Sequence, residues 1–160
     1  MEARYLGAPF RNRQSVNGML KIAVTVALCT AALASRAATE EQITLGRDLY
    51  LTYCAACHGR DGKGSIQPKG TGQTKPADLT KVAKRRGGVW PMLEVMSIID
   101  GYTKTTNPRP GMPVITALTE GPQTVFDSGN GRSVAVPERL LAVAKYLEII
   151  QSPEPDRSVP

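Results

Sequence analysis

The sequence predicts a small all-α domain in which three or four helices are separated by long loops. Apolar residues recur at helical spacing in three segments, residues 43–53, 92–99 and 140–150. Between them the chain is rich in turn formers, with 15 Gly and 12 Pro among 160 residues. This length gives room for one domain of ordinary size. Aromatic residues make up only 5% of the chain, so its core has space for a group other than side chains.

The first 37 residues are expected to be an N-terminal extension and a cleaved signal peptide. Residues 22–34 form an uncharged, mostly apolar run that follows Lys21 and ends in an Ala-x-Ala pattern. The run is too short to span a bilayer comfortably, although an uncleaved membrane anchor is the alternative. Met19 is an alternative start, and cleavage is expected after Ala34 or Ala37. The domain then covers residues 38–151, and residues 152–160 form a flexible tail.

Removal of this leader changes the charge balance. Its 37 residues hold five basic and one acidic side chain, so the mature chain has 15 basic and 13 acidic residues. The net charge therefore falls from +6 to +2, and nucleic acid is not an expected partner. Within the mature chain, residues 60–109 carry +6 and the remainder carries −4. We expect the basic segment to meet an acidic partner, unless it is only a solvated surface.

Capping residues, prolines and glycines indicate where each expected helix begins and ends. A capping box over residues 39–42, with Thr39 as N-cap, begins the first helix. A short helix is expected within residues 78–86. Pro91 suits the first turn of the next helix, which Gly101 ends, and Pro137 opens the last. Residues 103–113 should be an extended loop, and residues 125–136 a small β-hairpin that turns at residues 128–131.

The segment Cys54-Ala55-Ala56-Cys57-His58 carries the chemistry. The pattern C-x-x-C-H is the attachment sequence of c-type haem. Two thiols three positions apart near a helix end can reach both vinyl groups of one porphyrin, and His58 then lies beneath the iron as its proximal ligand. Cys29 is expected to leave with the leader, so Cys54 and Cys57 are the two cysteines of the mature chain. The cofactor expected is one covalently bound haem c.

Two other sites use paired cysteines. A thioredoxin-like site would follow a β-strand within a βαβ pattern, whereas the segment before Cys54 has helical spacing. A zinc site needs a fourth ligand, and the mature chain has no Cys or His beyond Cys54, Cys57 and His58. An export signal also suits haem, which is attached covalently outside the cytoplasm.

The mature chain resembles the class I c-type cytochromes over roughly residues 40–150. Gly46, Tyr50 and Cys54 resemble that family's N-terminal helix, in which a glycine lets the C-terminal helix cross closely and an aromatic packs against it. Tyr146 and Leu147 resemble the partner helix. Residues 57–64 and the Pro76-Ala77-Asp78-Leu79 segment are similar to bacterial members. The resemblance implies a small cytochrome c fold around a haem, and residues 114–136 depart from it by their length.

The sixth iron ligand is expected to be Met112. His58 is the only imidazole in the chain, so a second histidine cannot serve. Met92 and Met96 lie one turn apart on an apolar helix face and are expected to pack in the core. Met112 lies in the non-helical Pro110-Gly111-Met112-Pro113 loop, and the family's ligand methionine is typically followed by proline. An open site or a lysine ligand is the alternative.

Further contacts with the haem follow from the resemblance. The second nitrogen of His58 should be held by a backbone carbonyl, that of Pro76 or Ala77. Trp90, Tyr102 and Arg109 are candidates to reach the haem propionates, or else they are ordinary packing and surface residues.

The sequence thus indicates a periplasmic, single-haem cytochrome c, a monomer without a membrane span, that carries single electrons between redox proteins and is not an enzyme. Its partners would be a quinol–cytochrome c reductase, an oxidase or a dehydrogenase. A haem enzyme or gas sensor with an open sixth site is one alternative. A cytochrome subunit bound permanently to a dehydrogenase is the other.

Overall fold

The computed structural model describes residues 39–64, 75–104 and 112–160. The chain divides into two compact units, Met1–Thr39 and Glu40–Pro160, and the account below concerns the second. Residues 39–53 form the N-terminal helix. The elements that follow are α2 (Ala55–His58), η1 (Leu79–Lys81), η2 (Lys84–Arg86), β1 (Val89–Pro91), α3 (Met92–Ile99), η3 (Tyr102–Lys104), α4 (Thr116–Thr119), β2 (Gln123–Asp127), β3 (Ser133–Pro137), α5 (Glu138–Ile149) and β4 (Arg157–Val159).

The predicted helices are present, with local differences. Thr39 is itself helical, so the first helix does not begin after it as the capping box indicated. The segment 78–86 forms two separate 3₁₀ turns, η1 and η2, instead of one helix. Pro91 and Pro137 directly precede α3 and α5, as expected. The four-residue helix α4 was not predicted, because so short an element has no apolar periodicity.

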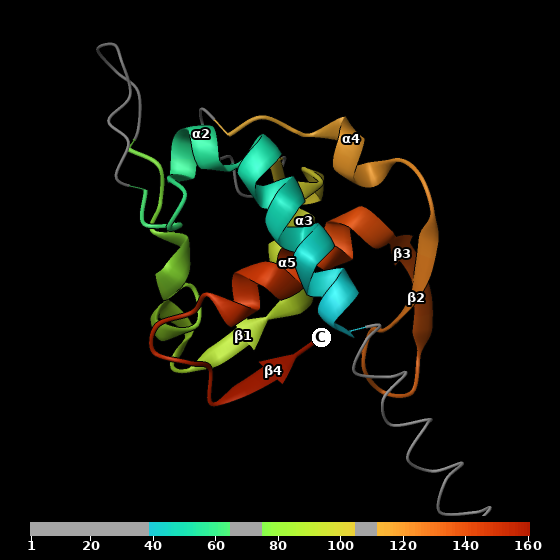
Figure 1. Ribbon diagram of the computed structural model, residues 1–160. Helices are drawn as coiled ribbons and strands as arrows, with labels where there is room; N and C mark the ends of the chain where they lie inside the picture. Colours follow the sequence, from blue (N-terminus) through green and yellow to red (C-terminus); the bar gives the residue numbers. More distant parts are fainter. Residues whose placement is uncertain (1–38, 65–74, 105–111) are drawn as a thin grey trace, which may run out of the picture. The chain divides into compact units, whose positions relative to one another are not determined.

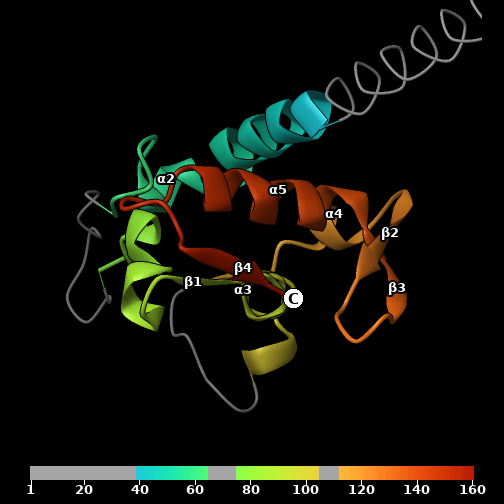
Figure 2. The ribbon, with the colours of Figure 1, turned by 90° about the horizontal axis from the view of Figure 1, so that it is seen from below.

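The N-terminal helix crosses α5 (Figures 1 and 2), and Gly46 lies at the point of contact, against Ala142. A Cβ at Gly46 would overlap the carbonyl group of Ala142 and lie 2.9 Å from the Cβ of Tyr146, so only glycine allows this approach. Next to the crossing, the rings of Tyr50 and Tyr146 pack with their centroids 5.4 Å apart. The close crossing implied by the family resemblance is therefore confirmed.

The core lies where α3 and α5 pack against each other beneath this crossing. The α5 stripe is buried from Leu140 to Leu147, and α3 buries one face, which includes Met92 and Met96. The largest fully buried side chains come from different elements and meet in this cluster: Trp90, Tyr50, Leu118 and Val143. Among the described residues, no helix is long and apolar enough to cross a membrane.

The predicted hairpin is present and slightly longer than expected. Strands β2 and β3 pair antiparallel, with Val125 opposite Ala135 and Asp127 opposite Ser133. The turn is closed by a hydrogen bond from Ser128 N to Arg132 O of 2.8 Å. Val125 is 74% exposed, so one face of the hairpin points to solvent.

The C-terminal residues differ from the flexible tail expected over 152–160. Strand β4 pairs in parallel with β1, which places Ser158 beside Trp90, and the two strands lie side by side in Figure 1. A further hydrogen bond of 2.8 Å runs from Asp156 N to Gly88 O. Proline and charge content indicated a tail, but composition alone does not reveal a strand that pairs with residues about 70 positions earlier in the chain.

Candidate functional site

The two cysteines and the histidine of the C-x-x-C-H motif lie together at the end of the N-terminal helix and in α2. Cys54 N donates to Tyr50 O at 2.9 Å, and His58 N donates to Cys54 O at the same distance. Three positions apart, the two cysteines lie on one side of this helical backbone, with Cys54 half-buried and Cys57 exposed. Neither forms a disulfide, so both sulfur atoms are available to bond to another group.

The two thiols differ in their surroundings. Burial, followed by the nearby Cys57 thiol, raises the pKa of the Cys54 thiol to about 11. Among the described residues, no group of three or more His, Cys, Asp or Glu side chains gathers to hold a metal ion.

The imidazole of His58 is oriented by the backbone. Its Nδ1 lies 3.0 Å from the carbonyl oxygen of Ala77, so Nδ1 carries the proton and donates to that oxygen. In the neutral ring the other nitrogen, Nε2, carries no proton and can bind a metal. Ala77 is one of the two residues that the sequence predicted for this contact.

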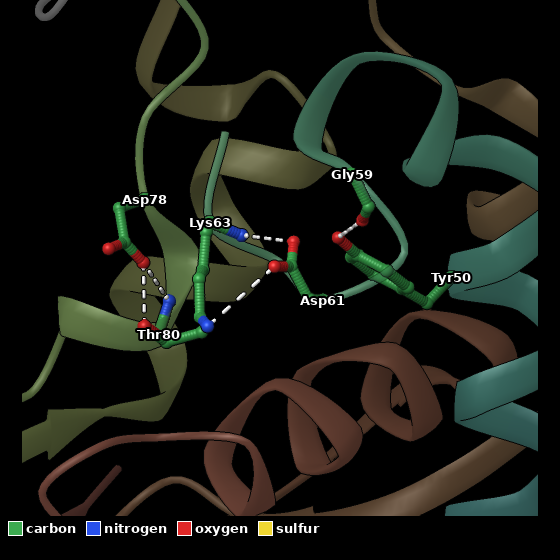
Figure 3. Close-up of polar contacts among 6 residues, drawn as sticks. All are labelled: Tyr50, Gly59, Asp61, Lys63, Asp78 and Thr80. Atoms are coloured by element: carbon green, nitrogen blue, oxygen red, sulfur yellow. Dashed lines mark hydrogen bonds and ion pairs between the residues drawn. The ribbon is translucent and has the colours of Figure 1, made fainter. Parts of the chain in front are cut away.

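Two segments, residues 59–64 and 75–80, are tied together around this contact. Gly64 N donates to His58 O at 2.8 Å, and Leu79 N donates to Gly62 O at 2.7 Å. A Cβ at Gly64 would lie 2.9 Å from Ala77 O, and its φ of +63° also favours glycine. Asp78 follows Ala77 and accepts bonds from Thr80 N at 2.9 Å and Thr80 Oγ1 at 2.6 Å (Figure 3).

Tyr50 supports the same loop from the N-terminal helix. Its hydroxyl is buried and donates to Gly59 O at 2.6 Å (Figure 3). Burial raises the pKa of the Tyr50 hydroxyl well above its ordinary value, with smaller contributions from Cys54, Tyr146 and Asp61. Tyr50 therefore stays neutral and holds the residue that follows His58.

Met92, Met96 and Met112, the methionines of the second unit, occupy different environments. Met92 and Met96 are 5% and 3% exposed and belong to the hydrophobic core, as the helix spacing predicted. Met112 is half-buried and packs against the edge of the same core cluster, which Cys54 also contacts. Met112 lies between the end of the undescribed residues 105–111 and α4.

Trp90 carries a polar atom without a partner. Its side chain is fully buried, and Nε1 has no hydrogen-bond acceptor in the described part of the chain. A buried N–H of this kind costs about 1–3 kcal/mol unless an acceptor completes it. A haem carboxylate would be such an acceptor, so Trp90 fits a bound haem together with the paired cysteines and the oriented imidazole. Of the other propionate candidates, Tyr102 is 81% exposed and Arg109 lies outside the described residues.

Basic side chains surround the segments that hold His58. Arg60, Lys75 and Lys84 are exposed. Lys63 lies 3.7 Å from Asp61 in an exposed pair (Figure 3), and Arg86 forms an ion pair with Glu94. Two further basic residues of the segment 60–109, Lys69 and Arg109, lie outside the described residues. Lys81 donates from Nζ to Ser152 O at 2.6 Å.

Sequence reasoning missed one buried polar residue near the site. Gln151 is 7% exposed and hydrogen-bonds with the backbone of residues 79–83. Its only signal in the sequence is a polar residue directly after the apolar stripe of α5, and a solvated helix end would show the same pattern.

Comparison with known proteins agrees with this geometry. Residues 43–120 match the family model described as "Cytochrome c". The match includes Cys54, Cys57, His58 and Met112, and it stops before the β2–β3 hairpin and α5. No curated protein and no solved structure matches the chain significantly.

Proposed function

Because this chain is a c-type cytochrome, whose haem c is attached covalently, we propose that it is an exported carrier of single electrons between redox proteins. The observation that best supports the proposal is the His58 imidazole, whose Nδ1 is held 3.0 Å from Ala77 O in the residue that directly follows Cys57. This arrangement orients an iron ligand.

We assign the covalent attachment to Cys54 and Cys57. Each thiol would form one thioether bond, which the C-x-x-C spacing allows on a single porphyrin. The half-buried Cys54 would hold the inner side of the group, and the exposed Cys57 would hold the side nearer to solvent. Trp90 Nε1 would donate to a propionate.

We assign the two axial positions to His58 and Met112. Haem iron, when bound, cycles between the ferric and ferrous states and so supplies the one-electron chemistry. His58 would bind through Nε2, because Nδ1 is committed to Ala77 O. Met112 would bind through its thioether sulfur, and it is the methionine of the mature chain that the buried core does not require. A Met/His pair raises the reduction potential relative to two imidazoles.

The partners would be redox proteins with acidic docking surfaces, in the periplasm. Arg60 and Lys75 are exposed on the two segments that hold His58, and Lys84 is exposed on η2, which supports a basic docking face. An electron carrier has to leave its partner quickly, so attraction between charges suits it better than a large apolar contact. A reductase, an oxidase or a dehydrogenase could supply such a surface.

Carbon monoxide binding distinguishes the proposed electron carrier from the alternative, a haem enzyme or gas sensor with an open sixth position. A carrier with Met112 on the iron should be six-coordinate and low-spin in both oxidation states, and its ferrous form should resist carbon monoxide at neutral pH. A ferrous protein that binds carbon monoxide rapidly and stoichiometrically would have an open sixth position, and the carrier proposal would then be wrong.

A further inference from the structure

Gln151 is buried at the end of α5 and uses its whole amide group. Its Oε1 accepts a hydrogen bond from Ala83 N at 2.9 Å. Its Nε2 donates to Leu79 O at 2.8 Å and to Leu147 O at 2.7 Å. One side chain thus joins the last turn of α5 to Leu79 at the start of η1 and to Ala83 directly before η2.

The residues after Gln151 strengthen this connection. Ser152 N donates to Thr80 O at 2.9 Å, and the chain that leaves α5 runs alongside η1 and η2 in Figure 2. Leu79 is therefore held on two sides, by Gln151 at its carbonyl and by Gly62 O at its amide. Ala77, whose carbonyl orients His58, lies only two residues before Leu79.

We propose that Gln151 is a positioning residue for His58, because its hydrogen bonds to the Leu79–Ala83 backbone fix the place of the Ala77 carbonyl. The inference rests on the proposed function only in taking His58 as the axial ligand. Gln151 does not touch the imidazole, and it acts through the backbone between Leu79 and Ala77.

The proposal predicts the direction in which the midpoint potential of the haem changes when Gln151 is replaced. A hydrogen bond from His58 Nδ1–H to a carbonyl raises the basicity of the imidazole and so favours ferric iron. If Gln151 no longer holds the segment, that bond weakens and the midpoint potential rises. General loosening that hydrates the haem acts in the opposite direction, since water stabilises the more charged ferric state.

The test compares Gln151→Met with Leu140→Ala in the intact haem-loaded protein. Methionine keeps the size of glutamine and removes all three hydrogen bonds, whereas Leu140 is a buried residue at the opposite end of α5. For Gln151→Met we expect at least a threefold higher ratio of reduced to oxidised protein at a fixed ambient potential. This ratio equals a rise of about 28 mV, at about 59 mV per tenfold change. Leu140→Ala should leave the potential unchanged or lower it.

A second variant and a second readout cover the case in which Gln151→Met does not fold. Gln151→Asn stays neutral and polar, but its side chain is one methylene shorter and cannot reach Ala83 N and Leu79 O together, so it should also raise the potential. In the wild-type ferrous protein, NMR hydrogen exchange should show that the Ala83 amide and the His58 Nδ1 proton open with the same free energy. Independent opening of these two protons would contradict the proposal.

The outcomes separate this inference from the proposed function. An unchanged or lowered potential in both Gln151 variants would overturn the positioning role, even if the wild type is a normal six-coordinate carrier. A wild type that lacks histidine ligation or binds carbon monoxide freely would instead refute the proposed function, and the proton-exchange comparison would still report on the Gln151 contact.

Discussion

His58 and Ala77 are 19 residues apart in the chain, and the structure places the imidazole Nδ1 3.0 Å from the Ala77 carbonyl oxygen. Gly64 allows this contact, because its missing side chain leaves room for the backbone of Pro76 and Ala77. The orientation of the proposed iron ligand therefore depends on a close approach between two loops and not on a side-chain partner.

Gly64→Ala should disturb this contact. The new methyl group has to displace the carbonyl groups of Pro76 and Ala77, and the left-handed backbone adds strain. We therefore expect a loss of about 1–3 kcal/mol in unfolding free energy and a higher midpoint potential. Gly87→Ala is the matched control, since its φ of +64° is nearly the same but a Cβ there meets nothing within 4 Å. Denaturant unfolding and redox titration measure both effects. Equal potentials in the two variants would show that Gly64 does not act through Ala77.

Gly46→Ala should separate the N-terminal helix from α5. A Cβ at Gly46 overlaps the Ala142 carbonyl, and overpacking of this kind typically costs about 1–3 kcal/mol. Arg47→Ala, at the exposed neighbouring position, should change stability by only about 0.5 kcal/mol. If thermal or denaturant unfolding shows equal stability for the two variants, the helices do not cross at Gly46.

Tyr50→Phe should change how stability depends on pH. At pH 8 the variant loses the bond to Gly59 O and leaves a buried acceptor unpaired, at a cost of about 1–3 kcal/mol. The pKa of Tyr50 is raised in the folded state, so the folded protein binds this proton more tightly than the unfolded chain. Wild-type stability should therefore fall as the pH rises above about 10, whereas phenylalanine removes this loss.

Denaturant unfolding at pH 8 and pH 11 checks this prediction, with Tyr53→Phe as a control for the loss of a more exposed hydroxyl. The difference in unfolding free energy between wild type and Tyr50→Phe should shrink at the higher pH. A constant difference would contradict the role given to burial of the Tyr50 hydroxyl.

Lys84→Glu should slow electron transfer to an acidic partner. Lys84 is exposed on η2, and steering by charge raises association rates roughly tenfold or more at low salt. Lys81 is a poorer choice, because its Nζ is bonded to Ser152 O and its loss would also disturb the C-terminal segment. Arg132→Glu controls for net charge, since the hairpin lies on the opposite side from η2 in Figures 1 and 2.

Stopped-flow rates at increasing salt measure this effect. Surface charges are screened beyond about 8 Å at physiological ionic strength, so the rate of wild type and its advantage over Lys84→Glu should both fall as salt rises. Equal slowing by Arg132→Glu, or rates that do not depend on salt, would mean that the basic face is not the docking surface.

Local patterns in the sequence predicted the parts of the fold that local chemistry determines. The C-x-x-C-H spacing, the prolines before α3 and α5, and the turn of the hairpin each depend on a few neighbouring residues. The close crossing at Gly46 and the Ala77 carbonyl could be predicted only because the sequence resembles a known family, in which those positions have these roles.

Long-range backbone contacts could not be predicted in this way. The pairing of β4 with β1 and the hydrogen bonds of Gln151 join residues about 70 positions apart. They depend on where α5 ends relative to η1, and the hydrophobic periodicity of the sequence does not predict this position. For the same reason Trp90 could be named as a candidate, but its unpaired Nε1 became visible only in the fold.

The most direct test of the central claim is a potentiometric titration, followed by absorption, of the wild type and of Met112→Ala. Met92→Ala and Met96→Ala serve as controls, which should keep the spectrum and lose about 2–5 kcal/mol of stability as buried core residues. The wild type should titrate as one reversible one-electron step between two low-spin states, with the weak red-edge band of Met-ligated ferric haem. Met112→Ala should lose that band and titrate at a lower potential, because the thioether favours the reduced state. A Met112→Ala protein that keeps both the band and the potential, or a wild type without a reversible one-electron step, would contradict the account.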